Sequence, residues 1–176
     1  MLTKKERSKE ESDALIRAMA WNDGFGCYTR AGFEKMIWPE IAERARWIVY
    51  FDIDDIHALN KKFGSYDPVD AMVKAALSVV RITDYVAGQW KSGDEFLVCL
   101  TEEKQLAFSD QLLGSSELRV EIDPLAVVNR LEDALKREGL SATFAVVPVT
   151  SRDLRATMKP AVDMVYQGKE QRGDKR

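Results

Sequence analysis

The fold of this chain is decided by the stretch Trp90-Lys91-Ser92-Gly93-Asp94-Glu95-Phe96-Leu97-Val98-Cys99-Leu100. Ser92-Gly93 predicts a tight turn, because glycine reaches backbone angles that other residues avoid. The apolar run from Phe96 to Leu100 is typical of a buried strand. Two adjacent acids, Asp94 and Glu95, stand between the turn and the strand. Buried carboxylates are costly unless they are paired or bound to metal, so these acids predict a partner.

A second apolar run lies about forty residues upstream and also ends in acids. It runs from Trp47 to Phe51 and is followed by Asp52-Ile53-Asp54-Asp55. If the two strands are neighbours in one sheet, three or more carboxylates meet at one end. Mg²⁺ or Mn²⁺ prefers such oxygen ligands and keeps open positions for phosphate oxygens. The alternative is a set of solvated acids at strand ends.

Composition limits the classes of protein that this chain can represent. Its 176 residues, 45% hydrophobic, suit one domain with a full core. A net charge of -3 argues against a basic surface, so we expect no DNA partner. Two widely separated cysteines argue against a disulfide framework or a zinc site, and they fit a reducing compartment. We find no apolar stretch that predicts a signal peptide or a membrane span, and we expect a cytoplasmic protein.

Hydrophobic periodicity and turn residues predict the order of helices and strands. Helices are predicted over 1–20, 29–44, 56–63, 69–80, 124–138 and 151–167. Strands are predicted over 47–52, 85–87, 95–100, 117–122 and 142–149, with 22–27 as a loop. This order predicts an α/β (α+β) sandwich whose mostly antiparallel central sheet is flanked by helices. We divide the chain into an N-terminal helix or linker, 1–21, and a domain, 22–176.

Four blocks of sequence follow one another at informative spacings. Residues 22–33 contain Gly26, Arg30 and Phe33; the other blocks are FDIDDIHALNKKFGS (51–65), SGDEF (92–96) and AVDMVYQGK (161–169). Together they resemble the GGDEF domain family, the diguanylate cyclases, over most of residues 22–173. The resemblance implies a fold like that of nucleotide cyclases and polymerase palm domains.

The resemblance also implies a metal-dependent nucleotidyl transfer. Asp52 and Asp94 would bind two divalent cations, with help from the backbone carbonyl of Ile53. Glu95 would act as a base for the attacking 3′-hydroxyl or as a further metal ligand. The substrates would be two GTP molecules and the product cyclic di-GMP. Each half of the product needs its own GTP site, so the family works as a head-to-head dimer and we expect a transient homodimer.

Other positions would bind the nucleotide by the same resemblance. Asn60 and Asp70 would contact guanine, although Asp70 matches only after a one-residue insertion. His57 stands where the family has a phosphate-contacting lysine. Lys169 would reach the triphosphate, and Arg172 would replace an arginine whose position falls on Gly173. Each of these residues also has a purely structural alternative. Asn60 and Asp70 would cap helices, His57 would lie on the surface, and Lys169 would be a solvated charge of the tail.

The family's inhibitory product site has a similar pattern here. Arg81-Ile82-Thr83-Asp84 has the letters R-x-x-D, but seven residues separate it from the signature instead of five.

Three functional hypotheses follow from the resemblance. The first is a diguanylate cyclase. The second is a GGDEF-like receptor that binds GTP or cyclic di-GMP without turnover. The third is a related nucleotide cyclase or palm enzyme with another product.

Overall fold

The computed structural model describes residues 15, 19–81, 83–88, 90, 93–102 and 122–172. Nearly all of the helix predicted over 1–20, the strand predicted over 117–122 except its last residue, and Ser92 of the predicted turn lie outside these residues. The strands are β1 (Trp21–Asn22), β2 (Cys27–Thr29), β3 (Ala45–Ile53), β4 (Tyr85–Gly88), β5 (Glu95–Thr101) and β6 (Ala142–Pro148). The helices are α2 (Arg30–Gly32), η1 (Phe33–Ile37), α3 (Trp38–Ile41), α4 (Ile56–Phe63), α5 (Asp67–Leu77), α6 (Pro124–Arg137) and α7 (Leu154–Arg172).

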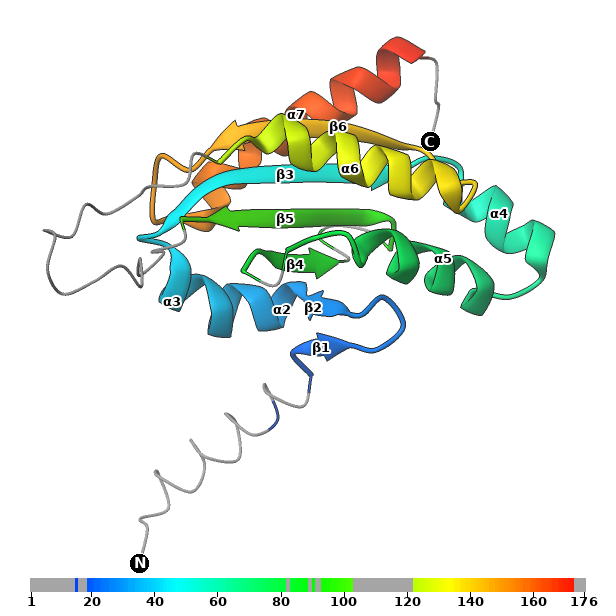
Figure 1. Cartoon of the computed structure of the whole chain (residues 1–176), viewed down its shortest axis with the longest axis horizontal. Helices are drawn as coiled ribbons and strands as arrows, with labels where there is room; N and C mark the ends of the chain where they lie inside the picture. Colours follow the sequence, from blue (N-terminus) through cyan, green and yellow to red (C-terminus); the bar gives the residue numbers. More distant parts are fainter. Residues whose placement is uncertain are drawn as a thin grey trace, which may run out of the picture.

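The six strands form one sheet in the order β1-β2-β4-β5-β3-β6 (Figure 1). The pairing of β2 with β4 is parallel, and every other pairing is antiparallel. β4 and β5 form the hairpin that the sequence predicts. The α+β sandwich with a mostly antiparallel sheet is therefore confirmed.

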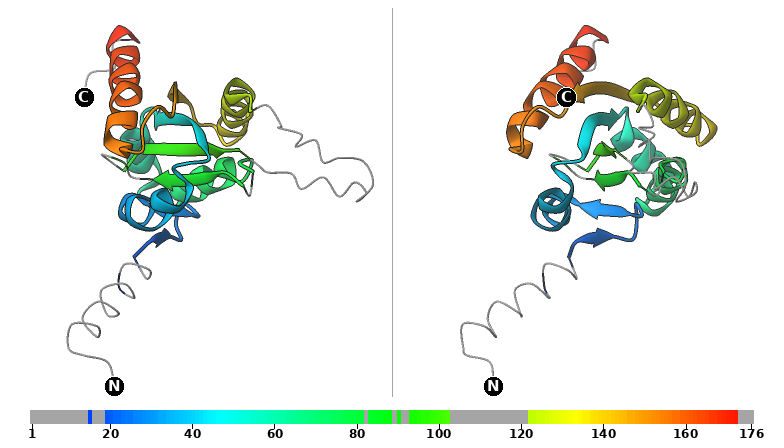
Figure 2. Two further views of the ribbon diagram at one scale, coloured as in Figure 1. Left: turned by 90° about the vertical axis from the view of Figure 1, so that its left-hand side faces the viewer. Right: turned by 60° about the vertical axis from the view of Figure 1, so that its left-hand side comes forward.

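Two helical layers cover the two faces of this sheet. One core lies between the sheet and α4, α5 and α6, and it contains Phe51 and Phe96. The other lies between the sheet and η1, α3 and α7, and it contains Tyr50 and Leu97. Figure 2 shows α7 (red) and α6 (yellow) on opposite sides of the strands. Because side chains alternate along a strand, Asp52 and Glu95 face the same side as Tyr50 and Leu97, the α7 side.

Strands β3 and β5 are neighbours, as the two apolar runs predict. Their register pairs Val49 with Val98, Phe51 with Phe96, and Asp52 with Glu95. Every residue of β5 is buried, which explains why its sequence is apolar without alternation. The pairing places the acidic ends of both strands at one end of the sheet.

The segment before β3 differs from the prediction. The loop predicted over 22–27 includes parts of β1 and β2, two short strands joined by a turn with Gly26 at φ 67°. Strands of two and three residues are too short for their periodicity to be detected. The helix predicted over 29–44 consists of α2, η1 and α3, and it ends at Ile41. Pro39 lies in the first turn of α3, where its missing N–H costs least.

The bounds of α5 and α7 differ modestly from the predicted ones. α5 begins at Asp67, so Pro68 lies in its first turn and not in the preceding loop. α7 runs from Leu154 to Arg172, five residues beyond the predicted end. α4 begins at Ile56 as predicted, and Asp55 before it has φ 54° and a side chain that makes no capping hydrogen bond. Within the described residues, the helices found are all too short or too polar to span a membrane.

Candidate functional site

The candidate site lies where β3 ends and β5 begins. Asp52 and Glu95 are opposite each other in the register, and their exposed fractions are 1% and 0%. The Ile53 N–H donates to the Asp94 carbonyl oxygen over 3.0 Å. Asp94 itself is half-buried. The structure thus brings Asp52, Asp94 and Glu95 to one end of the sheet, while what they bind stays a prediction.

The last turns of α7 supply cations to this end of the sheet. Lys169 Nζ lies 2.5 Å from Asp52 Oδ1 and 3.6 Å from Asp54 Oδ1. Arg172 Nη2 also lies 3.6 Å from Asp54 Oδ1. The Asp54 carboxylate accepts hydrogen bonds from the hydroxyls of Ser141 (3.0 Å) and Thr143 (3.1 Å). Lys169 and Arg172 therefore lie beside the acids, while their contact with a triphosphate stays a prediction.

Two tyrosines surround Glu95. The Tyr166 hydroxyl on α7 donates to Glu95 Oε1 over 2.9 Å. The Tyr50 hydroxyl is buried and makes no well-aligned hydrogen bond within the described part of the chain. Burial, and then the negative charge of Glu95, raise the pKa of Tyr50 above its ordinary value. Glu95 is therefore held inside the protein, whereas the neighbouring Asp94 is partly open to solvent.

The electrostatics of Asp52 reflect its burial. The pKa of Asp52 is raised from 3.8 to about 6, and burial is the largest cause. The hydrogen bond from Lys169 lowers this pKa, while the charges of Asp94 and Glu95 raise it again. The negative charge at Asp52 is thus only partly compensated by the protein, and a further cation at this site would stabilise it.

The donor set can be tested against a divalent cation. Nowhere in the described ranges do three Asp, Glu, His or Cys side chains group closely enough to hold a metal by themselves. Mg²⁺ is commonly bound by one or two carboxylates together with water and substrate phosphates. Asp52 and Asp94 suit that mode, because both are hard oxygen donors and Lys169 compensates only part of the charge of Asp52. These residues fit a cation that shares its coordination with a nucleotide.

The predicted guanine contacts lie on the helical hairpin that follows. Asn60 is on α4, and its Oδ1 atom is buried without a hydrogen-bond partner among the described residues. Asp70 is in the first turn of α5, and burial followed by the charge of Asp67 raises its pKa. A Cβ added at Gly24 would lie 3.3 Å from Asp70 Oδ2, so the β1–β2 turn packs against this carboxylate. His57 is exposed on α4.

The predicted inhibitory pair forms a structural contact. Arg81 donates to both Asp84 oxygens, with Nε–Oδ2 at 2.8 Å and Nη2–Oδ1 at 3.0 Å. Asp84 is buried and also accepts from the Thr101 N–H over 3.3 Å. This carboxylate therefore ties the loop before β4 to the end of β5. Product binding at Arg81 and Asp84 stays a prediction.

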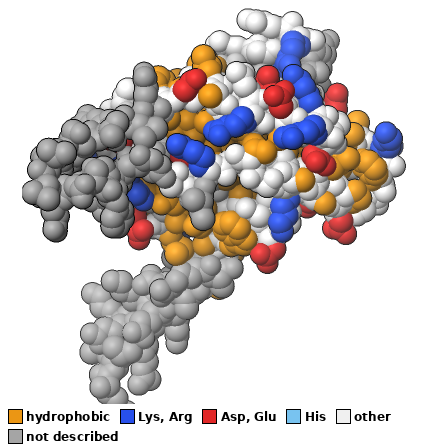
Figure 3. Space-filling model, viewed as in Figure 1, with side chains coloured by type: hydrophobic (Ala, Val, Ile, Leu, Met, Phe, Trp, Pro, Cys, Tyr) orange, Lys and Arg blue, Asp and Glu red, His pale blue; other side chains and the backbone are white. Residues whose placement is uncertain are grey.

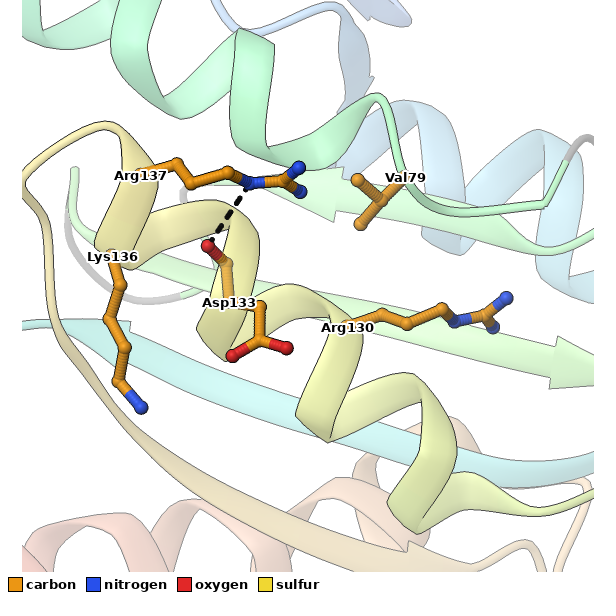
Figure 4. Close-up of a pocket in the computed structure, with 5 residues that line it drawn as sticks. All are labelled: Val79, Arg130, Asp133, Lys136 and Arg137. Carbon is orange, nitrogen blue, oxygen red and sulfur yellow. Dashed lines mark hydrogen bonds between the residues drawn. The ribbon is translucent and has the colours of Figure 1, made fainter.

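A separate hollow of about 650 Å³ lies between α6 and Val79, a residue of the segment that follows α5. Figure 3 shows Lys and Arg side chains in a row over this helix. Figure 4 shows Arg137 reaching toward Val79 while Lys136 points away. The remaining lining residues are Arg130 and Asp133. Because α6 covers the opposite face of the sheet from α7, this hollow is distinct from the acidic site.

Known structures share the fold of this chain. A microbial GGDEF domain studied with bis-(3′,5′)-cyclic di-GMP has a TM-score of 0.62 and 16% identity, covering 87% of this chain and 94% of its own. The diguanylate cyclase SiaD of Pseudomonas aeruginosa, in complex with its activator SiaC, has a TM-score of 0.63 and 19% identity, covering 95% of this chain and 64% of its own. A sensory box/GGDEF family protein of Caulobacter crescentus has a TM-score of 0.60 and 17% identity, covering 86% and 99%.

These likenesses establish that the chain has the GGDEF fold. No protein-family model matches the sequence, and no curated protein does. At these identities the fold is shared while the chemistry of individual positions has to be argued from the site itself.

Proposed function

We propose that this chain is a nucleotidyltransferase of the diguanylate cyclase type, which condenses two GTP molecules into cyclic di-GMP. The observation that carries the proposal is the pairing of Asp52 with Glu95 beside Asp94, with Lys169 within ion-pair distance. In each of two steps a 3′-hydroxyl oxygen bonds to the α-phosphorus of the other GTP. The bond from that phosphorus to the bridging oxygen breaks, pyrophosphate leaves, and the hydroxyl proton passes to a base or to water. We place this chemistry in the cytoplasm.

The different exposure of Asp94 and Glu95 suggests different roles for the two acids. Asp94 is the better candidate for the base, because it is half-buried and can meet a hydroxyl from solvent. Glu95 is fully buried and accepts from Tyr166, so a hydroxyl from solvent reaches it less readily, and it would serve as a further metal ligand. Asp52, Asp94 and the Ile53 carbonyl would hold Mg²⁺ or Mn²⁺. When bound, the metal supplies charge for the α-phosphate and the leaving pyrophosphate.

Nucleotide recognition is assigned to residues around the acids. The unpartnered Asn60 Oδ1 supports a contact with a base, because a buried amide oxygen without a donor is costly unless a ligand supplies one. Asp70 would accept from guanine N–H groups. Lys169 and Arg172 would meet the triphosphate. His57, exposed at the start of α4, would be a weak phosphate contact. Two such sites, from two copies of the chain in a transient homodimer, are needed for one product.

A second candidate is a receptor that binds GTP or cyclic di-GMP without turnover. The contact between Lys169 and Asp52 favours it, because an ammonium group already occupies one oxygen of the proposed metal ligand. The Vibrio cholerae LapD S helix-GGDEF-EAL protein, which has the same fold and is bound to c-di-GMP, is a precedent for binding of this ligand.

Turnover of GTP with Mg²⁺ or Mn²⁺ tests the proposal, with products separated by chromatography and ATP run in parallel. We expect cyclic di-GMP from the wild-type protein, and a loss of about 100-fold or more in Asp94→Ala. Asp163→Ala, which removes an exposed acid of α7, is the matched control and should retain activity. Nucleotide binding without any product would favour the receptor, and a different cyclic product would indicate a related cyclase.

A further inference from the structure

The Lys169 ammonium group is held between two carboxylates. It lies 2.5 Å from Asp52 Oδ1 and 3.6 Å from Asp54 Oδ1, and its side chain is only 15% exposed. The Asp52 side chain is 2% exposed. The pair is therefore almost removed from water, where an ion pair is screened far less than at the surface.

α7 is anchored so that Lys169 reaches this position. One turn earlier, Tyr166 donates to Glu95; one turn later, Arg172 lies near Asp54. Residues three apart lie on the same face of a helix, so all three side chains approach the sheet together. A Cβ added at Gly168 would lie 3.2 Å from Thr143 Cγ2, so glycine lets α7 approach β6 closely. The placement of Lys169 is thus built into the packing of α7.

A divalent cation at this site would bind the same carboxylate of Asp52 that Lys169 contacts. An ammonium and a dication on one carboxylate repel each other, more strongly in a buried site than in water. The repulsion is relieved if the ammonium moves to a phosphate oxygen of the nucleotide that arrives with the metal.

We propose that Lys169 and a divalent cation compete for Asp52, so that the cation binds tightly only together with a nucleotide whose phosphates accept the displaced ammonium. The proposal rests on the proposed function, because it requires a nucleotide at this site. It adds an order of assembly, because metal alone would bind weakly and metal with a triphosphate would bind tightly. Lys169 is then a residue that couples the two ligands.

Removing the Lys169 charge should change the two affinities in opposite directions. Lys169→Gln should bind Mn²⁺ alone about 5-fold more tightly or better, because Asp52 is freed. The same variant should bind a triphosphate more weakly, because it lacks the phosphate contact. A residue that merely stabilises the fold would weaken both affinities, so opposite signs are diagnostic.

The test uses the full chain, with Mn²⁺ as the probe metal. Free Mn²⁺ is measured by electron paramagnetic resonance, without nucleotide and with a GTP analogue whose α–β bridging oxygen is a methylene group. In the wild type the analogue should tighten Mn²⁺ binding by about 5-fold or more, and Lys169→Gln should lose most of this coupling. Lys159→Gln, an exposed lysine of α7, is the matched control and should behave as wild type. Thermal melts confirm folding, and Lys169→Met is the second variant because it keeps the apolar stem.

The outcomes distinguish a failure of the competition for Asp52 from a failure of the proposed function. Equal Mn²⁺ affinity in the wild type and in the folded Lys169 variants overturns the competition, even if the wild type binds the analogue well. If the wild type binds no analogue with Mg²⁺ or Mn²⁺, the proposed function fails. The proposed coupling between metal and nucleotide then fails too. A higher Mn²⁺ affinity in Lys169→Gln would still support competition between Lys169 and the metal for Asp52.

Discussion

At the scale of single residues, the candidate site is assembled at a cost in stability. Asp52 is buried beside Asp94 and Glu95, and Lys169 compensates only part of the resulting charge. A buried carboxylate with a pKa raised above its unfolded value favours the protonated form on folding. Such a residue destabilises the folded protein at neutral pH, as residues retained for function often do.

Replacing Asp52 by Asn should therefore stabilise the metal-free protein at high pH. The wild-type pKa rises from 3.8 to about 6 on folding, so the contribution of Asp52 to stability is fully present below pH 4 and is lost as pH rises through 6. At pH 8 the gain in Asp52→Asn should approach about 3 kcal/mol, and at pH 4 it should nearly vanish. Urea unfolding of both proteins at the two pH values measures the difference.

Asp163→Asn is the control for this comparison, because Asp163 is an exposed acid of α7 and should show little change. A loss of stability in Asp52→Asn at pH 8 would contradict the prediction. It would mean that Lys169 and Asp52 are worth more as a pair than the burial of the carboxylate costs.

The acids of the site could be predicted from sequence, but their partners could not. Asp52 and Asp94 each stand next to an apolar run, and adjacency of the two strands is sufficient to bring them together. The contact from Tyr166 to Glu95 depends on where α7 docks, which no local pattern specifies. The burial of Glu95 was missed for the same reason, because the letters Asp94-Glu95 do not show which acid faces inward.

At the scale of elements, the long runs were predictable and the short ones were not. The strands β3 and β5 are recognisable as continuous apolar runs and the helices α4 and α6 by their hydrophobic periodicity, and the predicted bounds lie close to those of the structure. β1 and β2 have two and three residues and are defined by pairing alone. The middle of the predicted helix 29–44 widens into η1, a tertiary adjustment that the apolar pattern does not indicate.

Gly32 is required because the backbone of Ala20 packs directly against α2 at this position. Thr29 caps α2 through its hydroxyl, and its N–H donates to the Ala20 carbonyl over 2.8 Å. A Cβ added at Gly32 would lie 2.4 Å from that same Ala20 oxygen. Backbone atoms cannot move aside as a flexible side chain can. The close approach of Ala20 to α2 therefore excludes any larger residue.

Gly32→Ala should destabilise the protein by about 1–3 kcal/mol, although alanine normally favours a helix. Chemical denaturation measures the change. Gly168→Ala is the matched control, because a Cβ at that helical position meets only the Thr143 methyl group at 3.2 Å. We expect a smaller loss at Gly168, because the Thr143 side chain can shift by a few tenths of an ångström whereas the Ala20 backbone cannot. Equal effects at the two glycines would show that helix propensity decides both, and that the contact with Ala20 is easily relaxed.

At the scale of the whole molecule, the sheet is unevenly protected. β5 lies inside the sheet between β4 and β3, with helices over both faces. β2 lies next to the edge strand β1, and β1 covers it with only two residues. Elements with fewer neighbours open more readily than the centre of the sheet. We therefore expect β1 and β2 to detach transiently from the sheet while the rest of the domain stays folded.

The two cysteines report on this difference, because Cys27 lies in β2 and Cys99 in β5. Burial raises the pKa of each thiol to about 12, so neither reacts in the native state near pH 8. We expect Cys27 to be alkylated faster than Cys99 under native conditions, and Cys99 to react only through global unfolding. Pulsed alkylation followed by peptide mass spectrometry measures both rates, and full unfolding in urea should make them equal. Identical native rates would mean that β2 opens only with the whole sheet, so the acidic site and the edge would share one cooperative unit.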